Sequence, residues 1–386
     1  MRGTCAVVPQ QRSRHRDVRA FVGTRRAMIT FARRAPDSAP VLPRLRSLAF
    51  AAALLAPVLG AIGEARAGPA PAAYAARSDV RAFIEQMVEE QGFDRRALRR
   101  AFAQVRYQPQ VVAAMERPLL APPKWYEYAP PLVTPARVDA GAAYWALHAD
   151  ALARAEERYG VPAEIIVAIL GVETYYGRNT GKYRVLDALS TLAFDYPRRS
   201  AFFRGELKQF LLLARELGIS PLAARGSFAG ALGVPQFMPG SYRSYAVDFD
   251  GNGHADLWTS TADVVGSVAN YLARHDWQPG QPVLIAAGIS DATRDQVLRR
   301  LDGGLSERRA RDAWAADGVT MTDAPDGLAP DPVGLLLLED NAGGVEGASF
   351  WIACNNFYVL TRYNRSRLYA AAVWELAKSI RAAHAR

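Results

Sequence analysis

Residues 165–177, IIVAILGVETYYG, decide the fold and contain the main candidate for a catalytic group. A helix that is apolar on all sides must be buried, so this pattern predicts a core helix over Pro162–Val172. The segment leads to Glu173. Burial disfavours a charged carboxylate and the negative end of a helix dipole disfavours an anion, so both raise the pKa of Glu173. A carboxyl that stays protonated near neutral pH can act as a general acid on a glycosidic bond. On spacing alone, a solvated or salt-bridged glutamate is the simpler interpretation.

The rest of the chain is predicted to be mainly α-helical, with one small α+β insertion. Apolar residues recur at helical spacing in several further segments. These predict short helices within Asp79–Met115 and longer ones at Ala136–Tyr159, Arg199–Leu217, Thr261–His275 and Ser366–Ala383. The insertion contains strand candidates at Val283–Ala287 and Val333–Leu338 and a short charged helix at Ala292–Arg300. We therefore divide the chain into a leader (1–67), a first catalytic part (68–278), the insertion (279–350) and a C-terminal catalytic part (351–386).

The leader has the features of a secretory signal. The apolar run SLAFAAALLAPVLGAIG, residues 47–63, follows Arg44 and Arg46 and precedes a small-x-small site at residues 65–67. This order of basic, apolar and cleavable segments is typical of export, and the run is short for a membrane span of about 20 residues. The chain has two cysteines, Cys5 and Cys354, and neither lies near the cleavage site. We expect a soluble periplasmic protein without a lipid-anchor cysteine, a disulfide framework or a zinc cluster.

The positive charge of the chain belongs to the leader. The formal net charge is +9 over 386 residues, which by itself suggests a nucleic-acid partner. Residues 1–67 hold 12 arginines, no lysine and three acidic residues, which leaves 35 basic and 35 acidic residues in the remainder. The remainder is formally neutral, so the composition gives no support to nucleic-acid binding.

A second motif, DFDGNGHAD at residues 248–256, resembles a calcium-binding EF-hand loop. Acid or amide side chains occupy positions 1, 3, 5 and 9 of the loop, and these residues are Asp248, Asp250, Asn252 and Asp256. Position 6 is glycine, and His254 at position 7 offers its backbone carbonyl. Position 12 is Thr259 where the EF-hand has a bidentate glutamate. The pattern predicts a calcium site with modest affinity and a structural role. The alternative is an Asp/Gly-rich turn.

Several motifs in register resemble the lytic murein transglycosylase B family (glycoside hydrolase family 103). They are GVET at 171–174 with Gly177, LDALSTL at 186–192, DYPRR at 195–199, GSFAG at 226–230, QFMP at 236–239, SVANYL at 267–272 and YN at 363–364. The resemblance runs from about Trp125 to the C-terminus and is poorest in the insertion. It implies a lysozyme-like helical fold that cleaves the MurNAc–GlcNAc β-1,4 bond without water. Glu173 would act as acid and then as base while the muramic C6 hydroxyl closes a 1,6-anhydro ring.

The resemblance also implies roles for other residues. Ser227 and Gln236 would bond the sugar near the acid, and Asn364 would orient Glu173 or substrate. Arg198 and Arg199 would hold muropeptide carboxylates, unless they form a solvated charge patch. Aromatic side chains would form sugar-stacking walls, although any one of them is as readily a core residue: Tyr128, Phe228, Phe237, Tyr271, Tyr363 and Tyr369. In the calcium loop, the resemblance implies a lengthened loop closed by Asp263.

Two other functions remain compatible with the residues. A hydrolytic muramidase would need a second carboxylate at a defined distance, and Asp187 or Asp195 could supply it. A catalytically silent protein could use the same cleft to hold peptidoglycan strands or to dock cell-wall synthesis proteins. The combination of Glu173, Ser227 and Gln236 argues against a binder, because binding alone does not need a desolvated acid.

Overall fold

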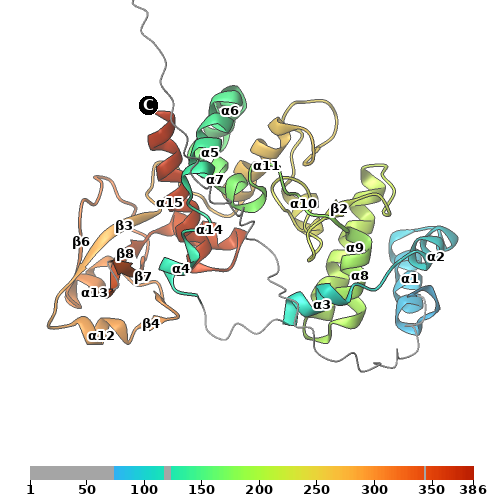
Figure 1. The fold of residues 1–386 in the computed structure, drawn as a ribbon, viewed down its shortest axis with the longest axis horizontal. Helices are drawn as coiled ribbons and strands as arrows, with labels where there is room; N and C mark the ends of the chain where they lie inside the picture. Colours follow the sequence, from blue (N-terminus) through green and yellow to red (C-terminus); the bar gives the residue numbers. More distant parts are fainter. Residues whose placement is uncertain (1–73, 117–122, 343–344) are drawn as a thin grey trace, which may run out of the picture. The chain divides into compact units, whose positions relative to one another are not determined.

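The computed structural model describes residues 74–116, 123–342 and 345–386, drawn as a ribbon in Figure 1. The predicted leader and signal segment (1–67) lie outside the described residues. Within the described part, no helix combines the length and apolarity that a membrane crossing requires.

Most of the described chain is helical, as the sequence predicts. The elements before the sheet are η1 (Tyr74–Ala76), α1 (Ser78–Gln91), α2 (Arg95–Ala103), α3 (Pro109–Glu116), α4 (Trp125–Tyr128), α5 (Pro135–Leu147), α6 (Ala149–Tyr159), α7 (Ala163–Thr174), β1 (Tyr183–Arg184), α8 (Val185–Asp195), η2 (Pro197–Arg199), α9 (Ser200–Glu216), β2 (Arg225–Gly226), α10 (Pro239–Tyr245) and α11 (Thr261–Arg274). After the sheet follow α14 (Asn355–Tyr363) and α15 (Arg367–His384).

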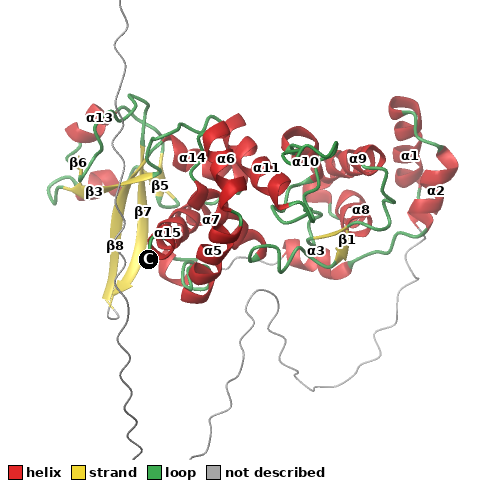
Figure 2. Ribbon diagram, turned by 90° about the horizontal axis from the view of Figure 1, so that it is seen from above, coloured by secondary structure: helices red, strands yellow, loops and turns green. Residues whose placement is uncertain are grey.

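A six-stranded antiparallel sheet occupies the segment predicted to be an α+β insertion, and Figure 2 shows its long hairpin of β7 and β8. The strands are β3 (Leu284–Ile289), β4 (Leu301–Asp302), β5 (Leu305–Ser306), β6 (Val319–Met321), β7 (Gly334–Ala342) and β8 (Val345–Ala353), in the order β4-β5-β7-β8-β3-β6, with α12 (Arg294–Leu298) and α13 (Arg311–Ala316) between them. The sheet has its own small core around Trp314, which is 1% exposed. Strand β8 continues beyond residue 350.

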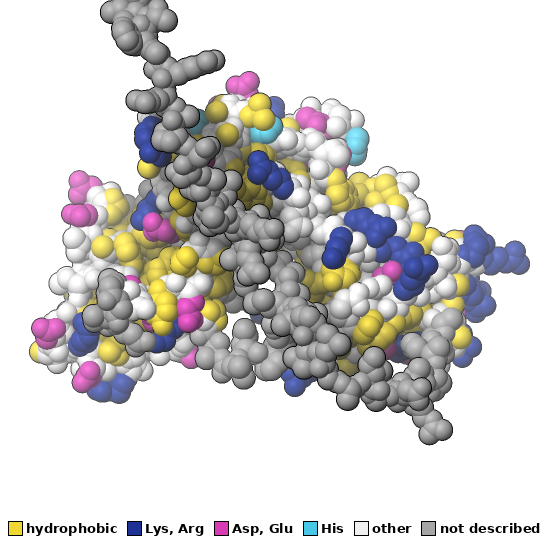
Figure 3. Space-filling model, viewed as in Figure 1, with side chains coloured by type: hydrophobic (Ala, Val, Ile, Leu, Met, Phe, Trp, Pro, Cys, Tyr) yellow, Lys and Arg dark blue, Asp and Glu magenta, His cyan; other side chains and the backbone are white. Residues whose placement is uncertain are grey.

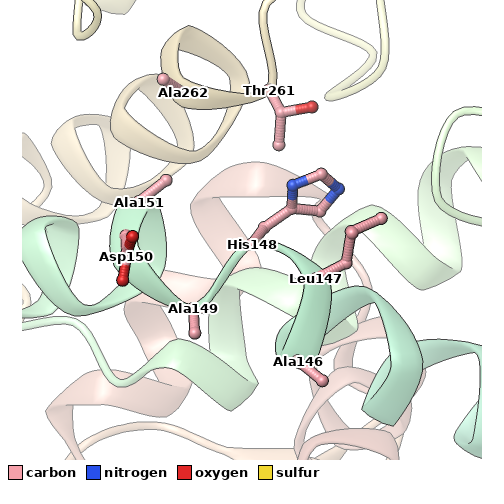
Figure 4. Close-up of a pocket in the computed structure, with 8 residues that line it drawn as sticks. All are labelled: Ala146, Leu147, His148, Ala149, Asp150, Ala151, Thr261 and Ala262. Atoms are coloured by element: carbon pink, nitrogen blue, oxygen red, sulfur yellow. The ribbon is translucent and has the colours of Figure 1, made fainter.

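The predicted helix over Ala136–Tyr159 is in fact two helices, which is a correction to the sequence analysis. Helix α5 ends at Leu147 and α6 begins at Ala149, because His148 leaves the helical conformation with φ −119° and ψ 26°. Figure 4 shows His148 at this junction, with Thr261 of α11 beside it. The junction borders a hollow of about 340 Å³ that contains none of the predicted catalytic residues.

Helix α7 is the buried centre of the helical part. Its residues from Ala163 to Gly171 are all buried, as expected for a segment without a polar face. Helix α15 packs along α7 and also along α5 (Figure 1). At the start of α7, the buried carboxylate of Glu164 accepts a hydrogen bond from Arg381, near the end of α15. At the other end of α7, Tyr369 from the first turn of α15 reaches Glu173. The two helices are therefore antiparallel and joined at both ends.

Candidate active site

Glu173 lies in the last turn of α7, and its carboxylate is held from α15. The Tyr369 hydroxyl donates a hydrogen bond of 2.7 Å to Oε1 of Glu173. Burial raises the pKa of Glu173 to about 7, and the hydrogen bond from Tyr369 acts in the opposite direction by favouring the charged form. A carboxyl with this pKa is present in both protonation states near neutral pH, so the same group can donate and accept a proton.

The backbone that follows Glu173 turns sharply. Tyr175 and Tyr176 have φ values of 52° and 59°, in the left-handed region that non-glycine residues rarely adopt. The Tyr176 hydroxyl donates a 2.8 Å hydrogen bond to the Arg137 carbonyl. This hydroxyl lies over Gly171, where a Cβ would come within 2.6 Å of the Tyr176 oxygen. The glycine two residues before Glu173 is therefore required by the packing of the turn.

Thr174 fastens the end of α7 to the loop that carries Gln236. Its Oγ1 donates to the Val234 carbonyl at 2.9 Å and accepts from the Gly177 N–H at 3.0 Å. The Val234 N–H in turn donates to the Leu257 carbonyl at 2.8 Å, in the predicted calcium loop. No role was predicted for Thr174 from the sequence. Its position directly after the acid was the only available signal, because the Val234 carbonyl is 60 residues away in the chain.

Ser227 and Gln236, predicted to bond sugar, have complementary free hydrogen-bonding capacity. The Ser227 hydroxyl oxygen accepts from the N–H groups of Ala229 and Ala231 at 3.2 and 3.0 Å, so its own hydrogen remains to be donated. The Gln236 Nε2 donates to the carbonyls of Gly233 and Thr180 at 2.8 and 3.1 Å, which leaves its side-chain oxygen as an acceptor. Together they offer one donor and one acceptor.

Three of the six predicted stacking rings are buried. Phe237, Tyr271 and Tyr369 are 2%, 7% and 2% exposed, so they offer a sugar almost no ring surface. The Phe237 and Tyr271 rings pack on each other with centroids 5.5 Å apart, and Tyr271 and Tyr369 pack on Tyr363 with centroids 4.9 and 6.5 Å apart. The structure replaces their predicted stacking role with a supporting one. The sequence alone does not distinguish a ring that lines the sugar cleft from a ring in the hydrophobic core, because both positions use the same residue types.

The other three rings keep accessible surface. Phe228 is 39% exposed, and Tyr128 and Tyr363 are partly exposed. Burial raises the pKa of both tyrosines, and the negative charge of Glu173 raises it further. The Tyr363 hydroxyl also donates to the Pro235 carbonyl at 2.6 Å.

The remaining predicted residues lie at the surface. Arg198 and Arg199 are exposed on η2, and the Arg199 guanidinium stacks 4.3 Å from the Phe202 ring centroid. Asn364 is exposed at the end of α14, and its backbone carbonyl accepts from the Ser366 N–H. The hydrogen bond that orients Glu173 comes from Tyr369, whereas Asn364 was predicted to orient either Glu173 or the substrate.

Asp187 and Asp195 are engaged in structural contacts. Asp187 accepts from the Arg106 N–H at 3.1 Å and from Arg184 at 2.7 Å. Asp195 pairs with the Arg77 guanidinium and accepts from the Tyr74 hydroxyl, both at 2.5 Å. These contacts tie α8 to the segments before it and leave neither carboxylate as an evident second catalytic group.

Three carboxylates of the predicted calcium loop come together. Oxygen atoms of Asp248, Asp250 and Asp263 lie within 4.8 Å of one another, and Asp263 is fully buried. Three like charges this close repel, and hard oxygen donors suit Ca²⁺, so the donor set fits the ion. Asp256 is not part of this group; its Oδ1 accepts from the N–H groups of Trp258 and Thr259, and its Oδ2 accepts from the Thr259 hydroxyl. The Asn252 side-chain oxygen accepts from the His254 N–H at 3.2 Å.

Comparison with known proteins agrees with this geometry. The family model "Transglycosylase SLT domain" matches residues 75–378. The chain is 40% identical over 316 residues to the membrane-bound lytic murein transglycosylase B of Escherichia coli K12, which covers 80% of this chain and 84% of the relative.

Two solved structures share the fold. The soluble lytic transglycosylase SltB1 of Pseudomonas aeruginosa has a TM-score of 0.73 and 44% identity, covering 80% of this chain and 100% of that chain. The Escherichia coli lytic transglycosylase Slt35 in complex with calcium has a TM-score of 0.72 and 41% identity, covering 81% of this chain and 96% of that chain. These matches confirm the lysozyme-like, mainly helical fold. The chain belongs to the transglycosylase SLT domain family and is a member of its lytic transglycosylases.

Proposed function

We propose that this protein cleaves the β-1,4 bond between MurNAc and GlcNAc in peptidoglycan and leaves 1,6-anhydro-MurNAc ends. The observation that carries the proposal is the single oriented carboxyl of Glu173, with its pKa near neutrality and a hydrogen bond from Tyr369. Acid and base work can then be done in sequence by one group. The structural contacts of Asp187 and Asp195 favour this over a two-carboxylate hydrolase.

The reaction needs no external nucleophile. Protonated Glu173 donates its proton to the glycosidic oxygen, and the bond from this oxygen to C1 of MurNAc breaks. The carboxylate then takes the proton of the MurNAc C6 hydroxyl, whose oxygen forms the new bond to C1 with help from the N-acetyl group. This proton replaces the one that leaves on the 4-hydroxyl of the released GlcNAc, so Glu173 is protonated again and the enzyme is regenerated. Tyr369 keeps the carboxylate in place in both steps, because its hydroxyl donates to Oε1.

We assign substrate contacts to the side chains that have an unused hydrogen-bonding group or an accessible ring surface. Ser227 donates to and Gln236 accepts from sugar hydroxyl or acetamido groups, while Tyr128, Phe228 and Tyr363 provide ring surface. Arg198 and Arg199 remain candidates for muropeptide carboxylates and Asn364 for a substrate contact.

We also propose that the loop of Asp248, Asp250 and Asp263 holds a structural Ca²⁺. Asn252, His254 and Asp256 remain candidates for further ligands. A bound ion would neutralise the three carboxylates and order the loop that contacts Val234 through Leu257. We place the protein in the periplasm, where its substrate lies, on the strength of the predicted signal segment. Peptidoglycan strands are its partner, and cell-wall synthesis proteins are further candidates.

Mass spectrometry of sacculi digested with the purified protein tests the reaction. Products that end in 1,6-anhydro-MurNAc support the proposal. Products heavier by one water would show a muramidase, and no products would show a binding protein. Glu173→Gln is the matched control, because the amide keeps the shape and the hydrogen bond from Tyr369 but cannot exchange the proton.

A further inference from the structure

The insertion is joined to the helical part at the outer edge of β7. Strand β7 pairs with β8 along its full length, but on its other side β5 pairs with it only at Leu336. Beyond this pair, the Leu337 carbonyl accepts a 2.8 Å hydrogen bond from Arg367, the first residue of α15. In Figure 3, hydrophobic side chains cover the region where Figure 1 draws β7 and α4. The edge that β5 leaves unpaired is therefore met by residues of the helical part.

The guanidinium of Arg367 uses all three of its nitrogen atoms on the insertion. Nη1 donates to the Leu337 carbonyl, Nε donates to the Gly303 carbonyl, and Nη2 pairs with Oε1 of Glu339 at 2.8 Å. The turn between β4 and β5 leaves room for this group, because a Cβ on Gly304 would come within 2.5 Å of Cζ of Arg367. A planar guanidinium held by three acceptors is fixed in position and orientation. The sheet therefore fixes the start of α15.

Glu339 also joins the sheet to a second helix that carries a site residue. Its Oε1 pairs with Arg367, and its Oε2 accepts from the Trp125 N–H at 3.3 Å. Trp125 begins α4, and Tyr128 is the last residue of this helix. The side chains of Arg367 and Glu339 are only 13% and 26% exposed, so water weakens their attraction less than it weakens an open surface pair. We call Glu339 and Arg367 the sheet clamp.

The first turn of α15 leads directly from the sheet clamp to the acid. Arg367 lies two residues before Tyr369 in the chain. Ser366 caps the same turn, because its side-chain oxygen accepts from the Tyr369 N–H at 3.3 Å. The Tyr369 hydroxyl donates to Oε1 of Glu173 at 2.7 Å. A displacement of Arg367 therefore moves the hydroxyl that orients Glu173.

We propose that Glu339 and Arg367 are positioning residues, through which the insertion holds Tyr369 against Glu173 during the reaction. This inference rests on the proposed function, because it takes Glu173 as the acid and base. Neither residue of the sheet clamp touches the substrate, and both act through Tyr369. A misplacement of about 1 Å at a catalytic group can cost about 100-fold in rate, so a small movement of α15 is enough to matter. The insertion thereby takes part in catalysis, although none of the residues assigned to the substrate lies between 279 and 350.

The kinetic test uses two conservative variants of the sheet clamp. Glu339→Gln leaves one oxygen for two donors, and Arg367→Lys keeps the charge but loses the planar fork. Each variant should lower kcat about 10-fold and change KM less than about 2-fold. Each should also move the alkaline limb of the pH–rate profile to higher pH, because a weaker hydrogen bond from Tyr369 favours the charged form of Glu173 less. In a Tyr369→Phe background, Glu339→Gln should move the limb no further.

Asp317→Asn is the matched control for a purely structural role. It removes ion pairs to Arg300 and Arg309, which both belong to the insertion, and Asp317 has no contact with α4 or α15 among the described hydrogen bonds and ion pairs. This variant should lower the unfolding free energy and leave kcat and the alkaline limb unchanged. A fall in kcat equal to that of the sheet-clamp variants would show a general loss of stability and overturn the inference.

An NMR titration separates this inference from the reaction itself. Protein containing glutamate labelled with carbon-13 reports the pKa of Glu173 without a substrate, and Glu173→Gln assigns the resonance. The pKa should rise in Glu339→Gln and in Arg367→Lys and stay constant in Asp317→Asn. An unmoved pKa in both sheet-clamp variants would overturn the inference. If wild type cleaves no peptidoglycan, the proposed function fails, and the titration still decides whether the sheet clamp holds Tyr369 against Glu173.

Discussion

Replacing Glu173 by glutamine should remove activity and, above neutral pH, stabilise the fold. The pKa of Glu173 rises on folding from 4.5 to about 7, so between these values the native state binds more protons than the unfolded state. The stability of wild type therefore falls as pH rises through this window. One pKa unit corresponds to about 1.36 kcal/mol, so the whole shift is about 3 kcal/mol. Glutamine is neutral at every pH and avoids this loss.

Urea unfolding between pH 4 and pH 9 measures the difference. Glu173→Gln should match wild type near pH 4 and exceed it by about 3 kcal/mol at pH 8 to 9, while cleavage of sacculi falls by about 10³-fold. Glu216→Gln is a control in which the change in unfolding free energy should have the opposite sign. The Arg243 guanidinium lowers the pKa of Glu216, so the charged form of Glu216 stabilises the folded state. A stability difference that does not depend on pH, or a Glu173→Gln variant that still cleaves, would refute the account of Glu173 as a desolvated acid.

Three further outcomes follow from the contacts around the acid and a fourth from the proposed calcium loop. Tyr369→Phe removes the hydrogen bond that lowers the pKa of Glu173, so the alkaline limb of the pH–rate profile should move to higher pH; an unmoved limb would contradict this. Thr174→Val keeps the volume but loses two hydrogen bonds, and should cost about 1–3 kcal/mol in unfolding free energy and lower kcat more than it changes KM. Gly171→Ala forces a Cβ against the Tyr176 hydroxyl and should cost about 1–3 kcal/mol by denaturant unfolding. Chelation of calcium should lower Tm and added Ca²⁺ should restore it, whereas an unchanged Tm would argue against a bound ion.

The sequence predicts the elements whose patterns are strong and local. The apolar run of α7 indicates a buried helix whatever its neighbours are, and the strands around Val283 and Val333 stand out by composition. The interruption at His148 was not predicted, because the helical pattern continues on both sides of this residue. Helix α8 was noticed only as a motif, because its polar residues Asp187, Ser190 and Thr191 are buried and mask the amphipathic pattern.

The sequence predicted which residues belong to the candidate site better than it predicted what each residue does there. The position of Glu173 at the end of an apolar helix gave the direction of its pKa shift correctly. The division of the aromatic residues into supporting and accessible rings depends on packing between distant segments. The same is true of the hydrogen bond from Tyr369, whose donor is 196 residues from its acceptor.

That separation in the chain has a consequence for the timing of activity. Glu173 lies in the middle of the sequence. Tyr369, whose hydroxyl orients it, belongs to α15, which is synthesised after the entire sheet. Because α15 is joined to α7 at both ends, through Tyr369 and through Arg381, the same helix supplies part of the core around α7 and the hydrogen bond to the acid. A chain that stops before α15, or has not yet folded it into place, keeps Glu173 without its orienting partner. Truncation before α15 therefore removes the packing of α15 on α7 together with the hydrogen bond to Glu173.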